Sequence, residues 1–234
     1  MSRLLLLSSS NVHGFGYLDH AAEQLRGFLR KERRVLFVPY AQMDHAGYAA
    51  RVRERLLPLG YAVDSLHAMN DTWEALEAAE AVFVGGGNTF LLLTTMYRLG
   101  LMERLRGRVA AGLPYVGSSA GTNLATRSIE TTNDMPIVYP PSFTALGLVP
   151  FNINPHYLDP DPHSTHKGET RETRIREFHE HHAAPVLGLR EAAMLRREGE
   201  TLTLRGTAGA RLFRRGQEPE EVAAGADLSE LLRG

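Results

Sequence analysis

The sequence predicts a three-layer α/β fold, in which a mostly parallel sheet carries helices on both faces. Two observations lead to this prediction. Short apolar runs alternate with stretches of helical periodicity from the first residues onward. The runs are continuous, as in residues 34–39 (RVLFVP), which is typical of strands that are covered on both faces. In such a sheet the ligand site lies beyond the carboxyl ends of the strands.

The predicted elements follow one another along the chain. Strands are expected at residues 4–7, 34–39, 61–66, 81–84, 115–116 and 185–189. Helices are expected at about 17–30, 45–57, 73–79, 102–111 and 170–182, and after the glycines at 85–87 and 117–121. Strands at 193–197, 201–204 and 210–214 are predicted to form a C-terminal β-meander, and the acidic tail to form a helix. Residues 127–166 lack helical periodicity and are typical of an irregular active-site wall.

Length and composition limit the possible functions. The chain has 234 residues, of which 43% are hydrophobic and 23% charged, and a single domain is expected over residues 1–234. The formal net charge of −1 gives no global basic field for nucleic-acid binding. The absence of cysteine excludes disulfides, thiolate metal sites and cysteine nucleophiles. The apolar run near the start is too short for a signal peptide or membrane span, so a cytoplasmic protein without membrane association is expected.

The segment Gly117-Ser118-Ser119-Ala120-Gly121 matches the G-x-S-x-G nucleophile elbow. A strand leads into it and a helix follows, which is the context that this motif requires. Its glycines allow the tight turn that exposes the Ser119 hydroxyl, and the Ala120 N–H lies at a helix start, where it can stabilise an oxyanion. The alternative is that these small residues only let a helix pack closely on a strand.

Three glycines, Gly85 to Gly87, end another predicted strand, and Asn88 follows as a helix N-cap. Glycines at this position let a backbone approach a ligand with free N–H groups. We expect them to lie at the same sheet edge as Ser119 and to supply a second oxyanion donor. A dinucleotide-binding loop is the alternative, although the spacing is not G-x-G-x-x-G.

Several charged residues later in the chain are candidates for the same site. His156 follows a proline that restricts its backbone, and Glu191 stands at the carboxyl end of a predicted strand, from where it could orient the imidazole. Arg171 and Arg174 could bind a substrate carboxylate. A structural histidine, a surface glutamate and a solvated helix face are the respective alternatives.

The histidines at 179, 181 and 182 invite comparison with a metal site. Their place in the last turn of a predicted helix is more simply explained by a favourable interaction with the helix dipole, and no strong metal-ligand spacing occurs. No metal is therefore expected.

Five separate motifs together resemble those of the S51 family of serine peptidases, which includes α-aspartyl dipeptidases and cyanophycinases. They are GGGNT at 85–89, GSSAGTN at 117–123, TTNDMP at 131–136, NPH at 154–156 and HKGETRE at 166–172. The resemblance extends to about Glu191. It implies a fold similar to class I glutamine amidotransferases and hydrolysis of dipeptides that begin with aspartate.

The resemblance also implies roles for individual residues. Ser119, His156 and Glu191 would form the catalytic triad, and the backbone N–H groups of Gly87 and Ala120 would form the oxyanion hole. Because an N-terminal aspartate carries both charges, we expect Asn88, Asp134 and Arg171 to bind the substrate; Asp134 is also a competing candidate for the acid of the triad. Aspartyl dipeptides are the expected partners, no cofactor is expected, and monomer and homodimer both stay open. The alternatives are a cyanophycinase-like hydrolase of β-Asp-Arg bonds and an inactive module that binds an amino acid or nucleotide.

Overall fold

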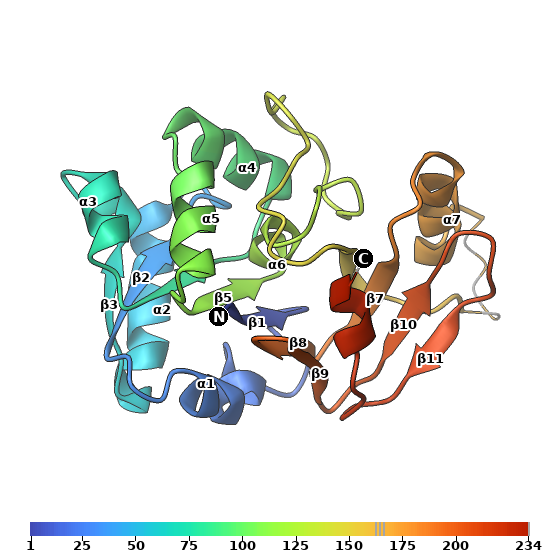
Figure 1. Cartoon of the computed structure of the whole chain (residues 1–234), viewed down its shortest axis with the longest axis horizontal. Coiled ribbons are helices and arrows are strands. Elements are labelled where there is room, and N and C mark those ends of the chain that lie inside the picture. Colours follow the sequence, from blue (N-terminus) through green and yellow to red (C-terminus); the bar gives the residue numbers. More distant parts are fainter. Residues whose placement is uncertain (162, 164, 166, 234) are drawn as a thin grey trace.

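The computed structural model describes residues 1–161, 163, 165 and 167–233 (Figure 1). Pro162, Ser164, His166 and Gly234 lie outside the described residues, so the first residue of the HKGETRE motif is not placed.

The larger sheet has the strand order β3-β2-β4-β5-β1-β8-β9 within the described part of the chain. Its parallel strands are β1 (Arg3–Leu7), β2 (Arg34–Val38), β3 (Ala62–Ser65), β4 (Ala81–Val84) and β5 (Tyr115–Ser118). The strands β8 (Ala193–Glu198) and β9 (Thr201–Gly206) extend the sheet in the antiparallel sense. The predicted mostly parallel sheet is confirmed.

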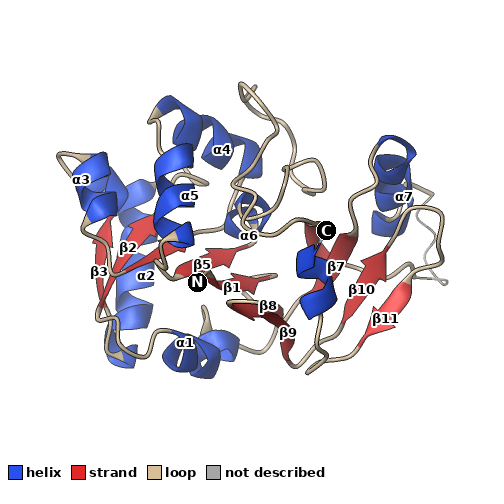
Figure 2. Cartoon of the chain, in the orientation of Figure 1, coloured by secondary structure: helices blue, strands red, loops and turns tan. Residues whose placement is uncertain are grey.

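Helices cover both faces of this sheet (Figure 2). One face packs against α1 (Ala22–Phe28) and α2 (His45–Leu56), and the other against α4 (Thr89–Arg98) and α5 (Met102–Ala110). The short helices α3 (Thr72–Glu77) and α6 (Ala120–Leu124) follow β3 and β5. Among the described helices, none has the length and apolar character needed to cross a membrane.

A second sheet lies beside the first, with the order β11-β10-β7-β6 (Figure 1). It contains β6 (Asn152–Tyr157), β7 (Val186–Arg190), β10 (Ala210–Phe213) and β11 (Glu220–Val222). The helix α7 (Arg171–His181) packs on this sheet through Ile175. The largest buried apolar cluster contains residues of both sheets, so their cores are continuous.

The C-terminal region differs from the sequence-based expectation. The three predicted strands form, but β8 and β9 join the larger sheet whereas β10 pairs with β7, so they do not make one meander. The chain bends between the sheets at Ala192, whose φ is 64°. The prediction of a helix in the acidic tail is wrong, because this segment contains β11 and a 3₁₀ helix at Ser229–Arg233. Gly225, with φ of 90°, interrupts the segment between them.

Strand β6 lies inside the segment that was expected to be irregular. Its asparagines are buried because backbone carbonyls accept their amide protons: Asn152 donates to Ser128 and Asn154 to Thr131. A strand with two asparagines and a proline has weak β-propensity, so sequence patterning does not reveal it.

The junction of β5 and α6 is closely packed against β4. A Cβ atom at Gly117 would lie 2.6 Å from the Gly121 carbonyl oxygen, and one at Gly121 would lie 2.1 Å from the Val84 oxygen. Backbone atoms at these distances leave no room for a side chain. The two glycines of the elbow motif are therefore required by packing.

We expect Gly121→Ala to destabilise the protein by about 1 to 3 kcal/mol, because the methyl group overpacks a backbone contact. Gly107→Ala is the matched control, since a Cβ atom there meets nothing within 4 Å and the exposed site lies within α5. That change should stabilise the helix by up to about 1 kcal/mol. Urea denaturation measures both, and equal stability of the two variants would contradict the packing argument.

Candidate active site

Ser119 occupies the turn between β5 and α6 in an unusual backbone conformation. Its φ is 52° and its ψ is −107°, a combination that non-glycine residues rarely adopt. The Ser119 N–H donates to the Leu7 carbonyl at 3.1 Å, which ties the turn to the end of β1. Strained backbone held in this way clusters at functional sites.

His156 and Glu191 lie next to Ser119. The Nε2 atom of His156 is 2.9 Å from Ser119 Oγ, and its Nδ1 atom is 3.0 Å from Glu191 Oε1. A register shift between Pro155 and Tyr157 interrupts the pairing of β6 with β7, and His156 has a positive φ of 53°. Because Nδ1 faces a carboxylate, the imidazole is oriented with Nε2 toward the hydroxyl.

Glu191 reaches this point by an unexpected route. The sequence places it at the carboxyl end of a predicted strand, but that strand, β7, belongs to the smaller sheet and not to the sheet that leads to Ser119. The residue lies in the short connection between β7 and β8, where the chain passes from one sheet to the other. Nucleophile and carboxylate therefore come from different sheets.

Ser8 connects the three segments that carry these side chains. Its hydroxyl accepts a hydrogen bond from the His156 N–H at 2.8 Å and donates one to the Leu189 carbonyl at 2.7 Å. Ser8 is fully buried and directly follows β1, whose end also binds the Ser119 backbone. Sequence reasoning did not identify this residue, because its contacts are formed only in the folded chain.

The glycine turn after β4 presents one amide to the site. The N–H groups on either side of Gly87 are engaged: Gly86 donates to the Tyr48 hydroxyl at 2.8 Å, and Asn88 to the Ala41 carbonyl at 2.8 Å. The Gly87 N–H has no hydrogen-bond partner among the described residues. Gly87 has a φ of 137°, and a Cβ atom there would lie 2.3 Å from the Ala41 oxygen. Glycine is required there, and its amide can donate to a ligand.

The side chains of Asn88 and Asp134 connect the TTNDMP motif to α4. Asn88 accepts from the Leu91 N–H, as the predicted N-cap, and donates to the Met135 carbonyl. The Asp134 Oδ2 atom accepts from the Thr89 N–H at 2.7 Å, from the Thr89 hydroxyl at 2.6 Å and from Thr132 at 3.1 Å. Glu191, and not Asp134, is the carboxylate hydrogen-bonded to His156.

Ser119 and His156 line a cleft of about 420 Å³. Asp134 lines it, together with the glycine turn and with residues that sequence reasoning did not select: Ser9, Ser10, Asn11, Tyr17, Gln42, Tyr48 and Arg51. Tyr48 and Arg51 are one turn apart on α2, which begins after the carboxyl end of β2. Their place on the helix after a predicted strand was the only feature of the sequence that could have indicated a role at this sheet edge.

Arg171 and Arg174 lie at the start of α7 and not among the cleft-lining residues. Burial lowers the pKa of Arg171, and the nearby Arg174 lowers it further, whereas Asp134 raises it. Arg171 is thus within electrostatic reach of Asp134. Arg174 forms an exposed ion pair with Glu169 at 3.4 Å.

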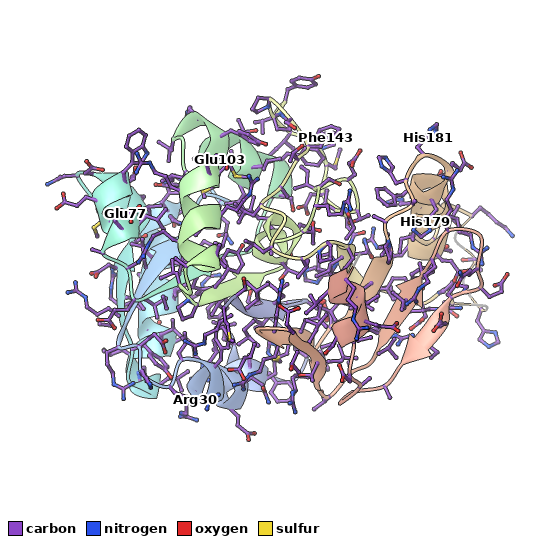
Figure 3. All side chains as sticks on the ribbon, viewed as in Figure 1. Arg30, Glu77, Glu103, Phe143, His179 and His181 are labelled. Atoms are coloured by element: carbon purple, nitrogen blue, oxygen red, sulfur yellow. The ribbon has the colours of Figure 1, made fainter. Side chains whose placement is uncertain are left out.

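The three histidines near the C-terminal end of α7 have separate environments; His179 and His181 are labelled in Figure 3. His179 is buried and its Nε2 atom is 3.0 Å from the Ala184 carbonyl. His182 stacks on Phe178 with a ring-centroid distance of 4.4 Å, and His181 is exposed. Among the described residues, no group of three histidine, aspartate or glutamate side chains is arranged to hold a metal ion.

The fold and the site together define a class of protein. A serine on a strand-to-helix elbow, an imidazole in contact with it and a carboxylate behind the imidazole form the geometry of an α/β serine hydrolase. The chain order serine, histidine, glutamate differs from the order serine, acid, histidine of ordinary α/β-hydrolases.

Comparison with known proteins identifies the family. Residues 4–205 match the model of peptidase family S51. The chain is 60% identical over 229 residues to "Peptidase E" of Streptomyces coelicolor, covering 98% of this chain and 94% of that protein. It is 56% identical over 233 residues to the "Probable alpha-aspartyl dipeptidase" of Drosophila melanogaster, covering 98% and 97%. The chain belongs to peptidase family S51, and it is a peptidase.

A solved structure supports the fold assignment. The crystal structure of a peptidase from an acI-B1 Actinobacterium superposes with a TM-score of 0.73 at 16% sequence identity. The match covers 97% of this chain and 96% of that one. At this identity the likeness concerns the fold.

We expect Ser8→Ala to slow covalent labelling of Ser119 by a small serine-directed phosphonate roughly 10- to 100-fold, because small displacements of a catalytic group are costly. The loss of one hydroxyl frees the His156 backbone from β1 and β7. Intact-mass spectrometry follows the labelling rate.

Ser118→Ala is the control for this experiment. Ser118 is equally buried, pairs with Leu7 in the neighbouring strand, and its hydroxyl has no partner among the described residues. The control should label at the wild-type rate. Equal rates for Ser8→Ala and wild type would contradict the positioning argument.

Proposed function

We propose that the chain is an α-aspartyl dipeptidase that hydrolyses Asp-Xaa through a Ser119–His156–Glu191 triad. The observation that carries the proposal is the continuous contact from Ser119 Oγ to His156 at 2.9 Å and from His156 to Glu191 at 3.0 Å. The names of the Streptomyces and Drosophila relatives supply the expected substrate class.

In the acylation half of the reaction, His156 Nε2 accepts the Ser119 proton as Oγ attacks the aspartyl carbonyl carbon. The carbonyl oxygen becomes an oxyanion, which the N–H groups of Gly87 and Ala120 stabilise. When the tetrahedral intermediate collapses, the C–N bond breaks and His156 gives its proton to the leaving amine. Glu191 stabilises the imidazolium that exists between these two transfers.

In the deacylation half, water replaces the amine. His156 takes a proton from the water as the water oxygen attacks the carbonyl carbon of the aspartyl ester on Ser119. Collapse of the second intermediate breaks the bond to Oγ, and His156 returns the proton to Ser119. Aspartate leaves, and the enzyme is regenerated without a cofactor.

The N-terminal aspartate of the substrate carries an ammonium and a carboxylate close together, so its pocket needs charges of both signs. Asp134 suits the ammonium, because its Oδ2 atom is held by Thr89 and Thr132 while its Oδ1 has no hydrogen bond among the described residues. Arg171 suits the carboxylate, since a guanidinium can bind it through two parallel hydrogen bonds. Asn88 contributes by holding the segment after Asp134 in place.

We expect Ser119→Ala to lower hydrolysis of Asp-Leu by at least ~10³-fold while the protein stays folded, because the nucleophile is removed. A screen of X-Leu dipeptides on the wild-type enzyme, read by release of leucine, tests the preference for aspartate. Retained turnover in the variant would contradict the mechanism. Faster hydrolysis of β-Asp-Arg than of Asp-Leu would favour the cyanophycinase-like alternative.

We expect Arg171→Met to lower kcat/KM for Asp-Leu roughly 10- to 100-fold, the usual size of a charge-assisted hydrogen bond. Arg176→Met on the same helix is the control, because the half-exposed Arg176 pairs with Glu172 and with the exposed Glu218. Such pairs contribute little, so the control should match the wild type. Steady-state kinetics on Asp-Leu distinguishes the two variants, and equal activities would exclude Arg171 from substrate binding.

A further inference from the structure

We infer that Arg51 binds the C-terminal carboxylate of the substrate, and that this contact selects dipeptides over longer or amidated peptides. The inference rests on the proposed function and extends it to the leaving residue.

Arg51 lies in the same cleft as the candidate triad. It lines the cavity with Ser119, His156 and Asp134. It is one turn after Tyr48 on α2, and the Tyr48 hydroxyl holds the Gly86 N–H beside Gly87. Burial raises the pKa of Tyr48 and the positive charge of Arg51 opposes that rise, so the guanidinium is within electrostatic reach of this hydroxyl.

Arg51 differs from the other arginines of α2. The guanidinium of Arg55 pairs with Asp19 at 2.9 Å, and that of Arg53 donates to the Val63 carbonyl at 3.2 Å. Arg51 forms no ion pair or hydrogen bond with any residue that the structure describes. Its charge is therefore uncompensated at the margin of a cleft that contains a candidate nucleophile.

Arg51 and Asp134 approach the cleft from opposite faces of the larger sheet. Asp134 is bound to Thr89 at the start of α4, which packs on one face, whereas α2 packs on the other. Ser119 follows β5, in the interior of the sheet. The cleft thus has a negative group on one side of the serine and a positive group on the other.

A dipeptide has the complementary charge distribution. Its ammonium and its carboxylate lie at opposite ends, about 7 Å apart when the two residues are extended. With the ammonium at Asp134 and the scissile carbonyl at Ser119, the rest of the substrate extends toward Tyr17, Tyr48 and Arg51. A guanidinium binds a carboxylate strongly, but a peptide amide at that position offers no negative charge. The arrangement therefore favours a substrate that ends one residue after the scissile bond.

The test compares two substrates that share the scissile bond, Asp-Leu and Asp-Leu-amide, in the wild-type enzyme and in Arg51→Met. We expect the wild-type enzyme to have a kcat/KM roughly 10- to 100-fold higher for Asp-Leu, mainly through KM. Arg51→Met should lower the kcat/KM for Asp-Leu to about that for Asp-Leu-amide, so that the preference for a free carboxylate disappears. Arg51→Lys should restore part of the preference.

Arg26→Met is the matched control, since Arg26 is an exposed arginine of α1 without an ion pair or hydrogen bond among the described residues. It should keep the wild-type preference. Equal preferences in wild type and Arg51→Met, or no preference in the wild type, would overturn the role of Arg51 while hydrolysis itself persists. Failure of the wild-type enzyme to cleave either substrate would overturn the proposed function and this role with it.

Discussion

The close approach of α6 to β4 and β5 is the constraint on which the site depends. Backbone atoms fill the space where side chains at Gly117 and Gly121 would lie, so the chain must turn sharply between them. Ser119 absorbs that turn with a positive φ, and its hydroxyl emerges in contact with His156 while the adjacent amide begins a helix. The packing of the core thereby creates the reactive geometry, and a change that relaxes the turn acts on stability and chemistry together.

The second sheet brings the other two members of the candidate triad to this turn. His156 interrupts β6 at a register shift, and Glu191 lies where the chain leaves β7 for β8. The backbone is irregular at both positions: His156 has a positive φ, and so does Ala192, which follows Glu191. The buried Ser8 hydroxyl joins β1 to both segments. The contacts that fix the two sheets relative to each other thus lie close to the candidate triad. A small displacement there would have the largest effect on the reaction rate.

The sequence predicted most of the larger sheet and the residues of the candidate triad, because turn chemistry and strand ends are local. The glycine elbow, the Pro155-His156 pair and the end of the strand before Glu191 can be read from a few neighbouring residues. The strand β6 was missed because its asparagines are polar in sequence and are satisfied only by distant carbonyls. The division of β8, β9 and β10 between two sheets was also missed, since strand spacing does not determine which edge a strand joins. Ser8 and Arg51 required three-dimensional proximity.

In the proposed function, segments outside the strands recognise the two charged ends of the dipeptide. The carboxyl ends of β4 and β5 supply neutral amides and a hydroxyl, which suit any acyl group and confer no preference for charge. The charged residues come from opposite sides of the cleft. Asp134 belongs to the TTNDMP segment, which hydrogen bonds with Asn88 and Thr89 attach to α4, and Arg51 belongs to α2. These attachments include no residue of the candidate triad, and the contact nearest to Ser119 is the 3.5 Å hydrogen bond that Asn123 of α6 donates to the Thr89 hydroxyl. In the proposed function, substrate specificity and catalysis thus depend on different segments of the chain.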